Sequence, residues 1–139
     1  MKRLLTLPAI IVVLSLLASC AAKPTPAPTP TPVTDLESAA KTFVTLLRDG
    51  KYAEATQMFD PQMAAAFPTS KMQATWEGLV QQAGAFKEIK GVKMADEGGY
   101  RIAYVTCDFA QTPLDLKVVF GKDGRISGLW FVPAGSGGT

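Results

Sequence analysis

The chain contains no histidine, which excludes a histidine-based catalytic triad and a zinc site with a histidine ligand. It has only two cysteines, too few for a disulfide framework. A formal net charge of +2, with acids interleaved among the bases, gives no basic stripe for nucleic acid. The carboxylates are scattered without the spacing of metal ligands. The sequence therefore predicts no cofactor, no metal and no nucleic-acid partner.

Long apolar runs are also scarce, and the one that exists is short. Leu4 to Ala18 carries no charge and follows the basic start Met1-Lys2-Arg3. It has the length of a signal-peptide core and is shorter than the ~20 residues that span a bilayer. It ends in Leu17-Ala18-Ser19-Cys20. This order resembles the lipobox of bacterial lipoproteins, in which the cysteine is diacylated and becomes the new N-terminus.

The lipobox resemblance implies that residues 1–19 are a signal peptide and that Cys20 carries lipid, palmitate among its acyl chains. Two or three acyl chains on one residue make a permanent anchor, since each buried methylene contributes about 0.8 kcal/mol. The expected location is the outside of the cell membrane, or the outer membrane, of a bacterial cell envelope. The alternatives are a plain secretory signal and a helical anchor with an incidental cysteine. Loss of Lys2 and Arg3 would leave twelve basic and twelve acidic side chains.

Residues 20–33 read as the lipidated cysteine and a linker rich in proline and threonine. Five of the ten prolines alternate with small residues between Lys23 and Pro32. Proline fixes its own φ and makes its predecessor extended, so this run favours polyproline II. At ~3.1 Å per residue the linker would hold the domain about 40 Å from the lipid. The alternative is a recognition peptide for a proline-reading domain.

Four helical segments are expected before residue 84. The first begins with a capping box at Thr34-Asp35-Leu36-Glu37 and ends at Asp49-Gly50. A second covers residues 51–59 and is broken by Asp60-Pro61, and a single turn follows over 63–67. The fourth begins with a capping box at residues 70–73 and ends at Gly84.

After Gly84 the apolar period changes from 3.6 to 2, which predicts strands over residues 86–94, 100–109, 114–120 and 125–132. Short connections rich in glycine and aspartate predict hairpins between them. Gly91 marks a bulge in the first strand. Residues 134–139 form a flexible tail, which leaves residues 34–133 as the folded domain.

This order predicts an α+β fold with the N-terminal helices packed on one face of a curved four-stranded antiparallel meander. In the second strand Ala103, Val105, Cys107 and Phe109 should face the helices. Tyr104, Thr106 and Asp108 should face outward. The last strand is apolar on both faces, and its Leu129 and Phe131, with Tyr104 and Thr106, form a candidate interaction face. A homodimer contact or another envelope protein would cover it; the alternative is partial exposure of the aromatics.

A group of packing positions in this region is similar to a known family. They are Phe43, Leu46-Leu47, Gly50, Tyr52, Ala55, Phe59-Asp60, Trp76, Leu79, Gly84, Phe86 and Ile126-Ser127-Gly128-Leu129. Over residues 35–133 the chain resembles the bacterial domain-of-unknown-function family 3887. That resemblance implies a cone-like fold of the nuclear-transport-factor-2-like (cystatin-like) superfamily, which includes enzymes, ligand binders and dimerisation modules, so it does not select a function.

A catalytic reading needs an acid in a dry pocket beside a group that donates to developing negative charge. The candidates are Asp60, Glu77, Asp108, Tyr52 and Tyr104, and each acid also has a structural explanation as a cap or a solvated side chain. Cys107 reads as a buried core residue, because no histidine is present to activate it.

The sequence thus favours a membrane-anchored, non-enzymatic binding or interaction domain that dimerises or binds an envelope partner. A small-molecule carrier or sensor with a pocket inside the cone is the alternative. Packing of that space by Phe43, Trp76 and Phe109 would exclude it. An isomerase- or hydratase-like enzyme is the third reading, and it requires an inward acid with a polar partner.

Overall fold

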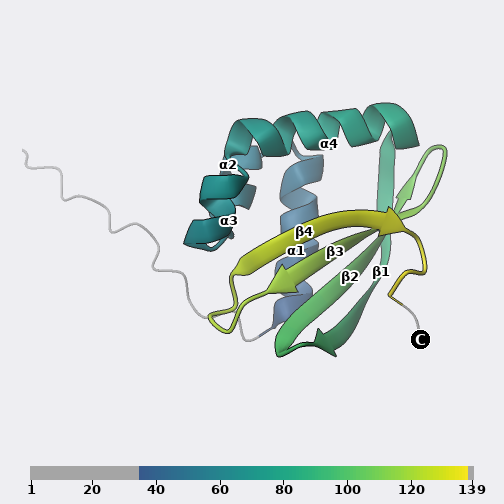
Figure 1. Ribbon diagram of the computed structural model, residues 1–139. Helices are drawn as coiled ribbons and strands as arrows, with labels where there is room; N and C mark the ends of the chain where they lie inside the picture. The colour runs from purple at the N-terminus through teal and green to yellow at the C-terminus, as the bar shows by residue number, and fades with distance from the viewer. Residues whose placement is uncertain (1–34, 138–139) are drawn as a thin grey trace, which may run out of the picture.

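The computed structural model describes residues 35–137, and in this part of the chain four helices precede four strands (Figure 1). The helices are α1 (Leu36–Arg48), α2 (Tyr52–Thr56), α3 (Pro61–Ala66) and α4 (Thr69–Ala83). The strands are β1 (Phe86–Glu97), β2 (Tyr100–Phe109), β3 (Leu114–Phe120) and β4 (Ile126–Pro133). They form one open antiparallel sheet in the order β1-β2-β3-β4. The predicted α+β class and the consecutive meander are both confirmed.

The start of α1 differs from the predicted capping box. Thr34 lies outside the described residues, and the cap is Asp35, whose carboxylate accepts a hydrogen bond from the Ser38 N–H at 3.2 Å. Aspartate caps as well as threonine and also places negative charge at the positive end of the helix. The buried side chains of α1 recur at helical spacing: Leu36, Ala39, Ala40, Phe43, Val44 and Leu47.

The next two helices are displaced from their predicted bounds because the chain between them pairs with β4. The Ile126 N–H donates to the Met58 carbonyl, and the Asp60 N–H donates to the Ile126 carbonyl, both at 2.9 Å. These bonds form a parallel bridge between Phe59 and Ile126, so α2 ends at Thr56. Pro61 begins α3 rather than only breaking α2. Proline is tolerated there because an N–H in the first helical turn has no acceptor within the helix.

The fourth helix begins two residues earlier than predicted and without the predicted capping box. Its N-cap is Pro68, so Ser70 lies inside the first turn rather than at the cap. Its predicted end is confirmed at Gly84, which has φ +86° and ψ 178°, a conformation that favours glycine strongly.

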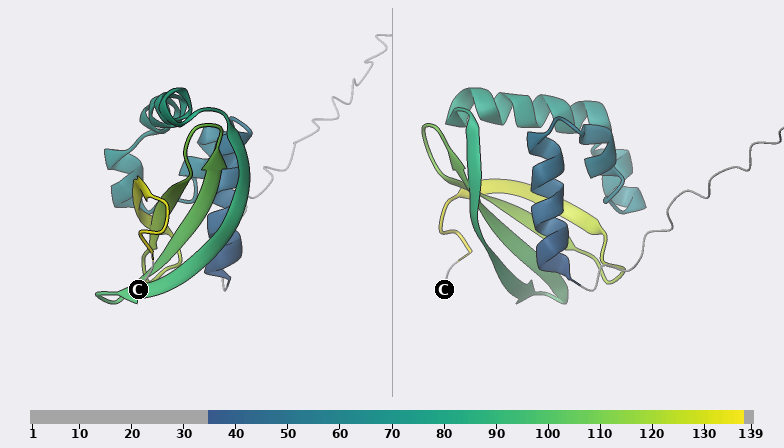
Figure 2. Two further views of the ribbon diagram at one scale, coloured as in Figure 1. Left: turned by 90° about the vertical axis from the view of Figure 1, so that its right-hand side faces the viewer. Right: turned by 180° about the vertical axis from the view of Figure 1, so that it is seen from behind.

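The helices do not all pack as one layer on a single face of the sheet, which differs from the prediction. Helix α1 lies along the face of β1 and β2, and α3 lies beside β4 (Figure 2). Helix α4 crosses one end of the sheet, where the Trp76 ring lies 5.9 Å from Phe109 and 6.1 Å from Phe86. None of the helices in residues 35–137 is long and apolar enough to cross a membrane.

The hairpins largely follow the predicted connections. Strand β1 continues to Glu97, which leaves Gly98-Gly99 as a two-residue turn in which both residues have positive φ. The pairing of β1 with β2 shifts between Ile89 and Gly91, which confirms the predicted bulge. Residues 134–137 of the expected flexible tail turn back toward the sheet, and the Gly135 N–H donates to the Asp115 carboxylate at 2.8 Å.

Candidate functional site

The inner face of the sheet, which faces α1, is filled by side chains. From β2 it carries the four predicted residues Ala103, Val105, Cys107 and Phe109, all in the buried core. Phe43 and Phe109 are 0% and 2% exposed, and Trp76 is 4% exposed. These three side chains fill the space in which the alternative reading placed a small-molecule pocket. This packing argues against a ligand site there.

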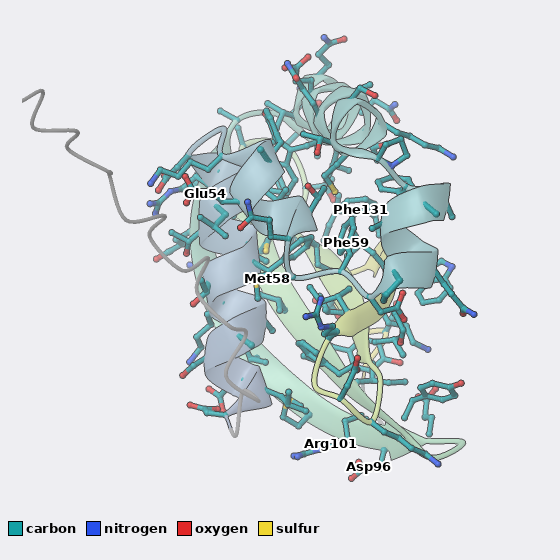
Figure 3. The ribbon with its side chains drawn as sticks, turned by 90° about the vertical axis from the view of Figure 1, so that its left-hand side faces the viewer. Glu54, Met58, Phe59, Asp96, Arg101 and Phe131 are labelled. Atoms are coloured by element: carbon teal, nitrogen blue, oxygen red, sulfur yellow. The ribbon has the colours of Figure 1, made fainter. Side chains whose placement is uncertain are left out.

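The four residues of the predicted interaction face do not share one side of the sheet. Tyr104 and Thr106 lie on the outer face, as predicted, although Tyr104 is only 6% exposed. Leu129 and Phe131 pack against the core on the inner face. Figure 3 shows Phe131 among the side chains between α1 and α3.

The reason for this division is an irregularity at the start of β4. Val119 pairs with Gly128 while the next residue, Phe120, pairs with Ile126, so one residue of β4 is extra at this point. Such a bulge shifts the alternation of side chains by one position. Ile126 therefore faces the core, and the odd-numbered Leu129 and Phe131 follow it inward. Trp130 is left on the outer face, 53% exposed.

The outer face holds a large groove, which we call the outer groove. Its volume is about 1070 Å³. Ile102 of β2, Val119 of β3, and Trp130 and Val132 of β4 give it apolar lining. Tyr100, half exposed, stands at the β1–β2 hairpin, and the β3–β4 turn also lines it. A concave apolar surface with exposed aromatic side chains is typical of a binding site.

The exposed indole is positioned by a glycine on the same strand. A Cβ at Gly128 would lie 2.5 Å from Trp130 Cζ3 and 2.6 Å from Cη2. The indole therefore lies close against the glycine backbone rather than extending freely into solvent. Gly128 precedes Trp130 by two residues, so the two share one face of the strand. This glycine–tryptophan spacing was the sequence signal that could have indicated the position of the indole.

Charged side chains around the outer groove pair with one another. Lys117 Nζ lies 3.2 Å from a Glu97 carboxylate oxygen and 5.4 Å from the centre of the Tyr104 ring. Hydrogen bonding to Tyr104 and then to Glu97 raises the pKa of Lys117 above its ordinary value. In the β3–β4 turn Asp123 also lines the groove and lies 4.0 Å from Arg125. The lining of the groove therefore combines apolar side chains with charges of both signs.

A smaller recess, which we call the side recess, brings two catalytic candidates together. It has a volume of about 460 Å³ and is lined by Tyr52, Trp76, Glu77 and Phe86, among others. Burial, and then the charge of Glu77, raise the pKa of Tyr52. A tyrosine with a raised pKa stays protonated near neutral pH and is a poor base or nucleophile.

The remaining candidate acids have structural partners. Asp60 is the N-cap of α3 and accepts from the Met63 N–H at 2.6 Å. Glu77 accepts from Gln73 at 2.8 Å on an exposed surface of α4. Asp108 lies on the outer face, 3.9 Å from Lys90. Asp60 and Glu77 line different depressions, so the structure does not assemble them into one site.

A buried acid that the sequence did not single out lies on the outer face. Asp115 is 1% exposed and accepts from the Thr106 hydroxyl at 2.7 Å and from the Gly135 N–H at 2.8 Å. These bonds fasten the residues after β4 across the sheet. Cys107, on the inner face, is fully buried, and desolvation followed by the charge of Asp115 raises the pKa of its thiol to about 12. The thiol is therefore unreactive at neutral pH.

Comparison with known proteins identifies the family. No curated protein and no solved structure matched the chain. A family described as protein of unknown function (DUF3887) matches residues 40–129, from within α1 to the middle of β4. That stretch is more than half of the chain and contains most of the core, the strand irregularity at Ile126 and the Gly128 that positions the indole. The chain is a member of the DUF3887 family.

Proposed function

We propose that this chain is a lipid-anchored protein that displays a binding domain outside the cytoplasmic membrane, and that the outer groove is its binding surface. The anchor rests on the sequence alone, through the basic start, the apolar run and Cys20. The observation that carries the binding role is Trp130, which is 53% exposed on Gly128 in a groove of about 1070 Å³. Exposed aromatic residues in an apolar concavity are the common anchors of protein recognition.

A binding role is favoured over catalysis because the candidate catalytic residues already interact with structural partners or stay protonated. Asp60 caps α3, Asp108 lies near Lys90, and the tyrosine beside Glu77 is held protonated. The finer fold assignment, to the nuclear-transport-factor-2-like superfamily, is likewise a proposal. It is supported by the succession of helices and a curved four-stranded meander.

Site-specific photo-cross-linking in the producing cells tests the outer groove. A benzophenone amino acid replaces Trp130 or Tyr100 in the full chain, and Gln82, exposed on α4, is the matched control. We expect defined adducts from the two groove positions and none from Gln82. A homodimer band would identify the partner as a second copy. Adducts that are equal at all three positions, or missing at both groove positions, would contradict the proposed function.

A further inference from the structure

The outer groove offers flat aromatic surfaces rather than a deep hole. The Trp130 indole rests on Gly128 and keeps about half of its surface exposed. Tyr100 is exposed to a similar degree at the β1–β2 hairpin and lines the same groove. Aromatic-lined grooves of this kind bind proline-rich segments in the polyproline II conformation, because that helix is already extended and loses little entropy on binding.

The groove carries charges of both signs rather than a field of one sign. Among its lining residues Lys117 pairs with Glu97, while Asp60, Asp123 and Lys122 add two acids and one base. The chain itself contains an uncharged segment of matching chemistry, Pro24 to Pro32, in which proline alternates with threonine and alanine. Polyproline II makes no internal backbone hydrogen bonds, so its carbonyls remain available to a donor such as the indole N–H.

The described domain begins at the correct end for this segment to reach the groove. In Figures 1 and 2 the start of α1 lies at the same end of the domain as the β1–β2 and β3–β4 turns. Both turns contribute lining residues to the outer groove. Pro32 precedes Asp35 by three residues, about 10 Å of extended chain, and residues 24–32 extend about 28 Å further. A short tether of this kind gives an effective concentration of the order of millimolar.

We propose that residues 24–32 of the chain bind in the outer groove in the polyproline II conformation, with proline rings against Trp130 and Tyr100. This inference rests on the proposed use of the groove as a binding surface. The linker would then both separate the domain from the lipid and cover the groove, and we call residues 24–32 in this bound position the strap. A partner would have to displace it, which lowers the partner's apparent affinity in proportion to the fraction of domains with an open groove.

Acrylamide quenching of tryptophan fluorescence in the detergent-purified full chain tests the strap. Trp76 is 4% exposed and Trp130 is 53% exposed without the strap, so quenching reports mainly on Trp130. Replacing all five prolines between residues 24 and 32 with serine should at least double the quenching constant. The matched control replaces Thr25, Thr29 and Thr31 with serine, keeps every proline and should leave quenching unchanged.

Cross-linking from position 130 supplies an independent measurement. With benzophenone at Trp130, mass spectrometry should find an intramolecular adduct to the segment 24–32, and the proline-to-serine variant should lose it. Gly128→Ala, which displaces the indole without deleting it, should raise quenching in the otherwise unchanged chain. Equal quenching in the wild type and the proline variant, with no intramolecular adduct, would overturn the strap. If adducts to other molecules still formed at position 130, the proposed function would survive that result.

Discussion

At the scale of single residues, the most consequential contacts are made by a carboxylate that the sequence pattern hides. Asp115 lies between apolar neighbours on a strand, where its polar character would suggest exposure. Instead it is buried beneath the turn that follows β4 and accepts hydrogen bonds from Thr106 and Gly135. A buried carboxylate is tolerable only when such donors are present.

Removal of the Asp115 carboxylate should loosen the residues after β4. We expect Asp115→Ala to lower the free energy of unfolding by about 1–3 kcal/mol, because two donors lose a buried acceptor. Hydrogen exchange at the Gly135 amide should accelerate, and urea unfolding measures the loss. Asp115→Asn is the matched control: its amide can accept from Gly135 and donate to the Thr106 oxygen, so it should cost less. An equal loss in both variants would contradict this account.

The raised pKa of Cys107 makes a prediction about alkaline stability. The thiol has a pKa of about 12 in the folded chain against 9.0 as the reference for an unburied thiol. Between these values the unfolded state releases the proton and the folded state retains it. The contribution of Cys107 is therefore fully present below pH 9 and is lost as pH rises toward 12.

Urea unfolding at intervals from pH 8 to pH 12 measures this contribution. The Cys107→Ala variant should show a shallower fall in the free energy of unfolding across that range than the wild type, whatever its stability at pH 8. Parallel curves for the two proteins would show that the thiol does not titrate as described.

At the scale of helices and strands, two glycines of one helix region should respond to alanine in opposite ways. Gly84 has φ +86°, and a Cβ there would lie 2.8 Å from Ala110 Cβ and 3.1 Å from the Gln111 backbone nitrogen. Gly84→Ala should therefore destabilise by about 1–3 kcal/mol. Gly78 lies within α4, and a Cβ there meets nothing within 4 Å. Gly78→Ala should stabilise by about 0.5–1 kcal/mol, since alanine favours a helix.

Thermal or urea unfolding of these two variants provides the comparison. The opposite signs are the test, because both variants add the same methyl group and change the unfolded chain in the same way. Loss of stability in both would mean that α4 does not tolerate a side chain at position 78.

At the scale of the whole molecule, the unknown of greatest consequence is attachment to lipid. Cys20→Ala should abolish incorporation of labelled fatty acid and release the protein from the membrane fraction, because the acyl chains would have no sulfur to bind. Cys107→Ala should retain both properties, which makes it the matched control. Fatty-acid label that persists in Cys20→Ala would show that another residue is modified.

The local conformational preferences of the chain could be predicted from its sequence. Two of the four strands have their predicted bounds, Tyr100–Phe109 and Leu114–Phe120, because period-two patterning and turn residues both delimit them. Equally local chemistry predicts which side chains of β2 face inward, the bulge at Gly91 and the end of α4 at Gly84. Family membership followed from packing positions of the same kind.

Only the tertiary structure decided which residues make the candidate site. An unpaired extra residue near Ile126 reverses the faces of β4, so Trp130 points outward while Leu129 and Phe131 pack inward. Sequence alternation could not reveal this, since β4 is apolar on both faces and the pairing of Phe59 with Ile126 bridges distant parts of the chain. The amino-acid sequence alone determined the helices and the meander, because those depend on neighbours along the chain, and the lipid anchor stays a prediction from the sequence. The outer groove and the burial of Asp115 depend on contacts between segments that meet only when the sheet has folded.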